Sequence, residues 1–203
     1  MKFLLFILLQ LQLIFVSGQI PLPAFENARK DTATFLQYLP VKADFIFIFS
    51  AEGYWQSDTE SYRLLVQEGE EWSAWTYYRK WKNASAFNNK GDKPHKYFFK
   101  KTSLGSRLVT ELFDSLGTVN FWSLCADSLN QTNGYDISDA VDYIFRIESP
   151  AGCQELDSYA PEYYLEKFPG MQQRAQFLKS IDIFNRWWKR NTEIREEVSN
   201  GSR

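Results

Sequence analysis

The sequence has a single histidine, His95, and two cysteines among 203 residues. A histidine-based zinc site or a multi-histidine catalytic metal centre needs more of these ligands than the chain offers. A nucleophile activated by histidine would have to use His95, and no Gly-x-Ser-x-Gly segment is present to hold a serine. Oxygen ligands for calcium occur between Asp127 and Asp136, but their spacing matches no EF-hand loop. Because glycine-rich phosphate loops and dinucleotide fingerprints are absent too, we predict no metal site, no cofactor and no assignable catalytic residue.

Positive charge does not predominate, and the long apolar run is confined to the N-terminus. Lys and Arg together number 23 against 25 Asp and Glu, which argues against a general nucleic-acid-binding protein. After Lys2, residues Phe3 to Val16 are apolar except for two glutamines. This pattern is typical of a signal peptide and is too short for a comfortable transmembrane anchor. We predict that residues 1–18 are cleaved before Gln19 and that the mature chain is soluble and exported, either periplasmic or extracellular.

The two cysteines, Cys125 and Cys153, lie in the part of the chain that is predicted to be exported. Disulfides form in such oxidising compartments, and the two residues fall on neighbouring predicted elements. We therefore predict a Cys125–Cys153 disulfide, with two buried free thiols as the alternative. Residues 19–203 have a length suited to a single domain, and their charge pattern predicts a frayed tail from about residue 191.

Aromatic residues make up 17% of the sequence and concentrate in a run of predicted strands. In the segment from Trp72 to Trp81, alternate side chains would place aromatic rings on both faces of a sheet. A strand that is apolar on both faces is typically central and covered on both sides. Gly69 predicts a tight hairpin, because a short loop needs a residue with positive φ. The predicted strands of this meander are Ala43–Ser50, Ser61–Gln67, Glu71–Trp81 and His95–Lys101.

The rest of the chain alternates helical and extended patterns. Apolar residues at helical spacing predict helices at Ala24–Leu39, from Thr102 or Ser103 to about Leu116, and from Gly170 to about Arg190. Further strands are predicted at Val119–Ala126, Ala140–Glu148 and Cys153–Tyr159. The fold class is therefore predicted to be α+β, as a single domain. It would have a mainly antiparallel sheet of about six or seven strands packed by N-terminal, middle and C-terminal helices.

Charge is segregated along the meander. Acidic residues predominate from Glu52 to Glu71, and eight Lys or Arg residues follow between Arg79 and Lys101. One interpretation is a basic, aromatic surface that binds an acidic partner or polyanion. The other is charge compensation across the hairpin, with Asp58 and Glu60 near Tyr78 and Lys80. The candidate ligand-binding residues of the first interpretation are Arg79, Trp81, Phe87, Lys93, Lys96 and Lys100.

Two functions remain open from the sequence. The first is a non-enzymatic binding or interaction protein that uses the basic, aromatic sheet surface, with an envelope polymer or another protein as partner. The alternative is a carboxylate-based hydrolase acting on a carbohydrate, because pairs of acids can cleave glycosidic bonds. The acids and aromatic rings that suit this alternative are Glu52, Asp58, Glu60, Glu70 and Glu71 with Tyr54, Trp55 and Trp72.

Overall fold

The structure is a computed structural model that describes residues 22–31, 37, 39–53, 59–80, 95–132 and 134–193. The predicted signal peptide and the end of the predicted tail lie outside these residues, as do Trp81, Phe87 and Lys93 among the candidate ligand-binding residues.

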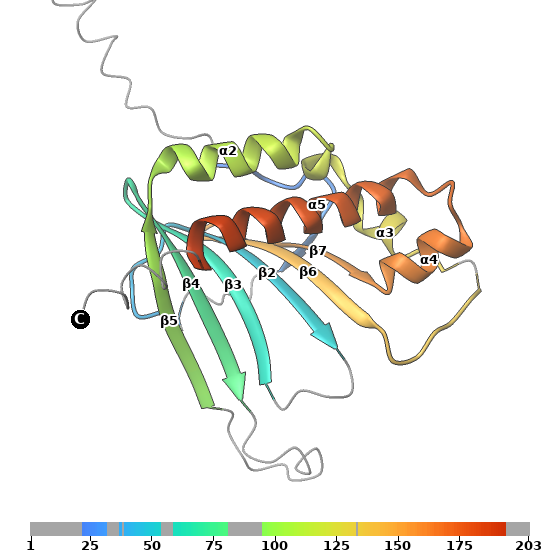
Figure 1. Ribbon diagram of the computed structural model, residues 1–203, viewed down its shortest axis with the longest axis horizontal. Coiled ribbons are helices and arrows are strands. Elements are labelled where there is room, and N and C mark those ends of the chain that lie inside the picture. Colours follow the sequence, from blue (N-terminus) through green and yellow to red (C-terminus); the bar gives the residue numbers. More distant parts are fainter. Residues whose placement is uncertain are drawn as a thin grey trace, which may run out of the picture.

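The fold is α+β, as predicted, and is built on one antiparallel sheet of seven strands (Figure 1). The strands lie side by side in the order β1-β7-β6-β2-β3-β4-β5. Strand β2 is the middle of the sheet and pairs with β6 on one side and β3 on the other. The strand bounds are β1 Arg29–Asp31, β2 Phe45–Gly53, β3 Thr59–Glu68, β4 Glu71–Lys80, β5 His95–Leu104, β6 Val141–Ser149 and β7 Gly152–Tyr159.

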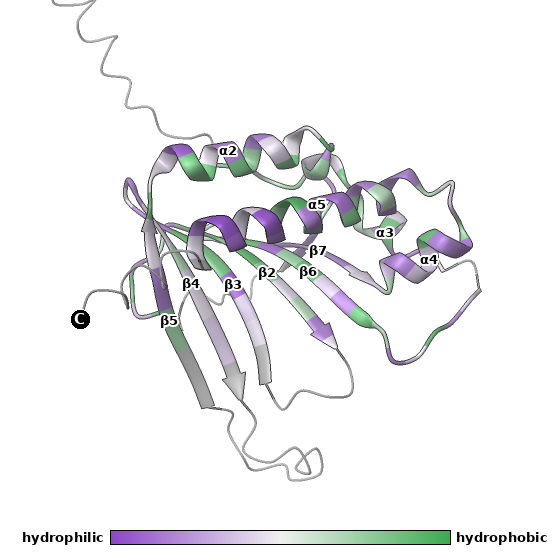
Figure 2. Cartoon of the chain, in the orientation of Figure 1, coloured by the Kyte–Doolittle hydropathy of each residue, from purple (hydrophilic) through white to green (hydrophobic). Residues whose placement is uncertain are grey.

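Two long helices, α2 (Ser106–Gly117) and α5 (Gln172–Trp188), lie across the same face of the sheet (Figure 1). Shorter helical turns lie between these helices and the strands: η3 (Phe121–Ser123), α3 (Ala126–Leu129) and α4 (Pro161–Lys167). The π-helical η4 (Lys189–Glu193) continues directly from α5. Figure 2 shows hydrophobic residues on the side of α2 that is turned toward the sheet. In the described residues, no helix combines the length and the apolar character needed to cross a membrane.

The main core lies between the sheet and the two long helices and is largely aromatic. Phe47 in β2 is fully buried and packs edge-on against Phe113 of α2 and Phe121, at centroid distances of 5.6 and 6.3 Å. It also stacks on Phe145 of β6 at 5.7 Å. Alternation along β2 places Ile46 in a second buried cluster on the opposite face of the sheet. We call this opposite face, away from α2 and α5, the far face.

Most of the predicted strands and the last helix are confirmed. The hairpin between β3 and β4 turns at Gly69, which has φ 59°. Strand β4 carries aromatic residues on both faces, with Trp72 in the main core and Trp75 and Tyr77 in the far-face cluster. Helix α4 was not predicted from the sequence. It begins at Pro161, whose fixed φ suits the first position of a helix.

Two predicted elements are wrong. Residues 24–31 are not the start of a helix, because they are extended and residues Arg29–Asp31 form β1 along the edge of β7. The Gln154 side chain also holds the Phe25 backbone, accepting from its N–H at 3.1 Å. The predicted strand Val119–Ala126 is a tight turn through left-handed Asn120 and then η3. Phe121, Leu124 and Ala126 are buried in this segment, and Ala126 already belongs to the short helix α3.

The predicted disulfide is also wrong, because Cys125 and Cys153 are thiols with no disulfide between them. Cys153 lies opposite Asp31 in the β1–β7 register, whereas Cys125 pairs with Asn27 through an isolated parallel bridge. The segment from Asn27 to Asp31 therefore keeps the two cysteines apart. Four residues of extended chain cover about 13 Å, and a disulfide requires Cα atoms within about 7 Å of each other.

Candidate ligand-binding site

A row of cross-strand neighbours runs over the far face of the sheet. Each residue of the row is the register partner of the next, on adjacent strands from β7 to β5, so their side chains share one face. The row consists of Asp157, Ile144, Ser50, Tyr62, Tyr77 and Phe98. It passes from an acidic side chain on β7, through aliphatic and hydroxyl groups, to three aromatic rings.

A cavity of about 340 Å³ opens along this row. Its volume is within the usual range for small-ligand sites, about 300–1,000 Å³. A second cavity of about 200 Å³ shares Arg146 and Glu155 with the first and is completed by Arg29 and Lys30. The residues that line the larger cavity are Ile48, Ser50, Glu52, Tyr62, Tyr77, Ile144, Arg146 and Glu155.

One wall of the larger cavity is aromatic. The rings of Tyr62 and Tyr77 lie 5.4 Å apart, and Tyr77 stacks on Phe98 with a centroid distance of 4.5 Å. The hydroxyl of Tyr62 donates to Oε1 of Glu52 at 2.9 Å. This bond fixes the Glu52 carboxylate beside the aromatic wall.

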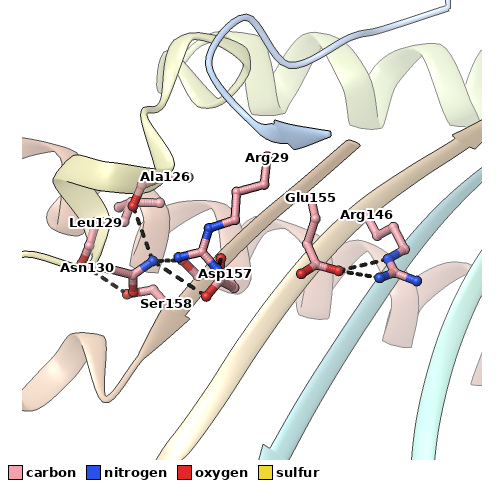
Figure 3. Close-up of polar contacts among 8 residues, drawn as sticks. All are labelled: Arg29, Ala126, Leu129, Asn130, Arg146, Glu155, Asp157 and Ser158. Carbon is pink, nitrogen blue, oxygen red and sulfur yellow. Dashed lines mark hydrogen bonds and ion pairs between the residues drawn. The ribbon is translucent and has the colours of Figure 1, made fainter. Parts of the chain in front are cut away.

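The opposite wall contains an ion-pair network centred on Arg146 (Figure 3). Its Nε and Nη2 lie 2.8 and 2.6 Å from Oε2 of Glu155, and its Nη1 lies 3.3 Å from Oε1 of the fully buried Glu148. Burial has the largest single effect and lowers the pKa of Arg146, but the charges of Glu155, Cys153 and Glu148 and the Glu155 hydrogen bond together outweigh it, so the net pKa is raised. Arg146 is therefore a permanent cation that is already paired with two carboxylates, Glu148 and Glu155.

Asp142 is the register partner of Glu52 across β2 and β6. Burial raises the pKa of Asp142 to about 6, the charges of Asp157, Glu52 and Glu155 act in the same direction, and Arg29 opposes them. Its Oδ1 is buried and has no hydrogen-bond partner among the described residues. Nη1 of Arg29 lies 3.5 Å from Oδ1 of Asp157, and Figure 3 shows these two side chains together. The charge of Asp142 is thus compensated only in part, through Arg29.

Ser50 occupies the centre of the row, between Ile144 and Tyr62. Only 1% of its surface is exposed, and its Oγ has no hydrogen-bond partner among the described residues. A buried polar group without a partner costs about 1–3 kcal/mol, and the great majority of such groups are paired in native proteins. Because Ser50 lines the cavity, its hydroxyl is placed to bond with a ligand there.

Among the side chains that the structure describes, the charges around the two cavities do not balance. The acidic ones are Glu52, Asp142, Glu148, Glu155 and Asp157, and the basic ones are Arg29, Lys30 and Arg146. In this described part of the far face, five carboxyl groups thus accompany three basic side chains. Within the described residues, no three acidic, histidine or cysteine side chains are grouped so as to hold a metal ion.

The structure describes little of the basic surface predicted from the sequence. Lys100 is exposed and lies opposite Trp75 in the register. The backbones of Arg79 and Lys96 face each other across β4 and β5, and Glu60 is the register partner of Arg79 rather than a neighbour of Lys80. The two-residue loop after Glu68 sets this register, since Glu68 and Glu71 are its closing pair.

Among the acids predicted for a hydrolase, those whose side chains the structure describes are Glu52, Glu70 and Glu71, and they lie apart. Glu52 lines the cavity, but Glu70 and Glu71 are exposed at the distant hairpin. Trp72 is buried in the main core and is therefore no platform for a sugar. Asp58, Tyr54 and Trp55 lie outside the described residues.

Sequence reasoning missed Asp142, Arg146 and Glu155. A signal was present in β6, where the polar residues Asp142, Arg146 and Glu148 occupy one face of an otherwise apolar alternation. No family model, curated protein or solved structure matches the chain.

Proposed function

We propose that the protein is a non-enzymatic binding protein, as the sequence predicts, and that it holds a small ligand in the far-face cavity. The observation that carries this proposal is the Ser50 hydroxyl, which is buried, unpartnered and on the cavity wall. The buried Oδ1 of Asp142 is a second unpartnered atom on the same face, and Asp142 is the register partner of the lining residue Glu52. A ligand with matching polar atoms would offset the desolvation of both groups, which have no hydrogen-bond partner among the described residues.

The arrangement suits binding because its walls are stiff. The cavity is built on strands of a central, hydrogen-bonded sheet rather than on a loop, and its polar groups are few and convergent among aromatic and aliphatic walls. Such pre-formed sites lose little conformational entropy when a ligand enters. The ligand should therefore change the shape of the described protein little.

Chemical-shift mapping tests this proposal with three probes that share one phenyl-ethyl body: phenethylamine, 2-phenylethanol and phenylacetate. We expect at least one probe to shift the backbone amide signals of Ser50, Tyr62 and Tyr77 together. The amide of Glu70, in the distant hairpin, serves as the internal control and should not move. If none of the three probes moves the cavity signals at millimolar concentration, the proposed site is refuted.

A carboxylate-based hydrolase remains the second candidate, because one observation favours it. Glu52 and Glu155 line a single cavity, and the neighbouring Asp142 has its pKa raised to about 6, which suits a general acid. Release of 4-nitrophenol from a panel of 4-nitrophenyl glycosides would test this. Activity that disappears in both Asp142→Asn and Glu52→Gln would establish a hydrolase, and no turnover by the wild-type protein would discard it.

The basic surface remains a separate proposal for a protein or envelope-polymer partner of the exported chain. Lys100, the member whose side chain the structure describes, is exposed on the edge strand β5. Reversing the charges of Lys93, Lys96 and Lys100 together should abolish capture of a polyanion such as heparin and leave thermal stability nearly unchanged. Equal capture by the variant would remove this surface from consideration.

A further inference from the structure

We infer that the far-face cavity selects a small primary amine with a flat apolar body, whose ammonium group is bound between Glu52 and Asp142. This inference rests on the proposed function and names the chemical class of its ligand. Glu52 and Asp142 are register partners on adjacent strands of the same face, next to the unpartnered hydroxyl of Ser50.

The charges select a cation. Side chains directly opposite each other on neighbouring strands have Cβ atoms about 4.5–5.5 Å apart, and like charges at these positions repel. Glu52 and Asp142 are such a pair, and their charges add to those of Glu155 and Asp157. A monocation between the two carboxylates turns this repulsion into two charge-assisted hydrogen bonds.

An anionic ligand is disfavoured because the cation on the cavity wall is already engaged. Arg146 is held by Glu155 and Glu148. A bare metal ion is disfavoured as well, since the described acids do not form a ligand cage. A primary ammonium group fits better. It carries three donors, which match the Asp142 Oδ1, the Glu52 carboxylate and the Ser50 hydroxyl oxygen.

The remaining walls select the body of the amine. Ile48 and Ile144 offer aliphatic surface, and the Tyr62 and Tyr77 rings stand side by side along the cavity. Aromatic faces attract both flat apolar groups and cations. The volume of about 340 Å³ lies at the low end of the usual range for small-ligand sites, about 300–1,000 Å³, so the ligand is a small molecule and not a peptide segment.

The test uses the full chain and the same three probes, whose bodies are identical and whose charges differ. Isothermal titration should show that phenethylamine binds about tenfold or more tightly than 2-phenylethanol, which is the difference that one charge-assisted hydrogen bond supplies. Phenylacetate should bind more weakly still. Equal binding of all three probes at the cavity would overturn the amine inference and leave the binding site itself in place.

Variants locate the ammonium site. Glu52→Gln and Asp142→Asn should each weaken phenethylamine binding about tenfold without lowering stability. Glu70→Gln, an equivalent change at an exposed acid of the distant hairpin, should leave the affinity within about twofold. Unchanged affinity in both cavity variants would overturn the inference, because the amine would then be bound elsewhere. Absence of any probe at the cavity amides would overturn it together with the proposed function.

Discussion

Replacing Asp142 with asparagine should stabilise the protein, because the ionised carboxylate is less favourable in the folded state than in the unfolded state. The pKa rises from 3.8 to about 6, through burial first and then the charges of Asp157, Glu52 and Glu155. A shift of this size corresponds to about 3 kcal/mol for a fully buried group at 1.36 kcal/mol per pKa step. Asp142 is only half-buried, so solvent screening reduces the expected gain at neutral pH to about 1–2 kcal/mol.

The pH dependence gives the sign of this effect. Between about pH 4 and about pH 6 the folded state binds the Asp142 proton more tightly than the unfolded state does, so the free energy of unfolding falls as the pH rises through this window. Asp142→Asn lacks this contribution. The stability gain of the variant should therefore be near zero below about pH 4 and reach its full value above about pH 6.

Urea unfolding of both proteins between about pH 4 and about pH 8 measures this difference. Asp114→Asn is the matched control, because Asp114 is exposed on α2, on the other side of the sheet. A variant that is no more stable at neutral pH, or whose gain is independent of pH, would refute the reasoning. If the inferred amine site is correct, the same substitution weakens binding while it adds stability, as is common for functional groups held in unfavourable surroundings.

Three further predictions follow from the core, the thiols and the N-terminus. Phe47→Ala should cost about 3–5 kcal/mol in urea unfolding, since the ring is fully buried among other aromatic rings; a cost below about 1 kcal/mol would contradict the described core. Without reductant, Cys125 and Cys153 should both react with iodoacetamide in the unfolded protein, whereas a disulfide would block both. Mass spectrometry of protein secreted by an expressing cell should find Gln19 as the first residue, and an intact N-terminus would contradict the predicted cleavage.

Local sequence patterns were sufficient to predict the strands and the hairpin where side-chain alternation and turn chemistry agree. The alternation of Phe45, Phe47 and Phe49 with isoleucines placed β2 within a few residues, and Gly69 placed the hairpin that follows β3. The predicted helix from Ala24 is wrong although the apolar spacing there is helical. The open edge of β7 provides backbone hydrogen-bond partners that an extended chain can use. Tertiary hydrogen bonding outweighed local propensity there.

The candidate site could not be predicted from one sequence, because it depends on which distant strands become neighbours. Glu52 and Asp142 meet only because β6 adds to the free side of β2. Ser50 gave no signal of its own, since a serine in a strand is ordinary and its lack of a partner is a property of the packed protein. The density of acids in the hairpin region made them candidates for a hydrolase site. In the structure, Glu70 and Glu71 are exposed and remote from the cavity.

The central position of β2 also determines when its two partner strands become available during synthesis. Its partner β3 and the following strands are complete by Leu104, but its other partner, β6, begins only at Val141. A nascent chain therefore leaves the ribosome with one long edge of a phenylalanine- and isoleucine-rich strand unpaired until β6 emerges. Such an edge is a template for pairing between chains. Truncated forms that end between β5 and β6 should for this reason aggregate, and the complete chain should depend on timely closure of the sheet or on a chaperone that shields this edge.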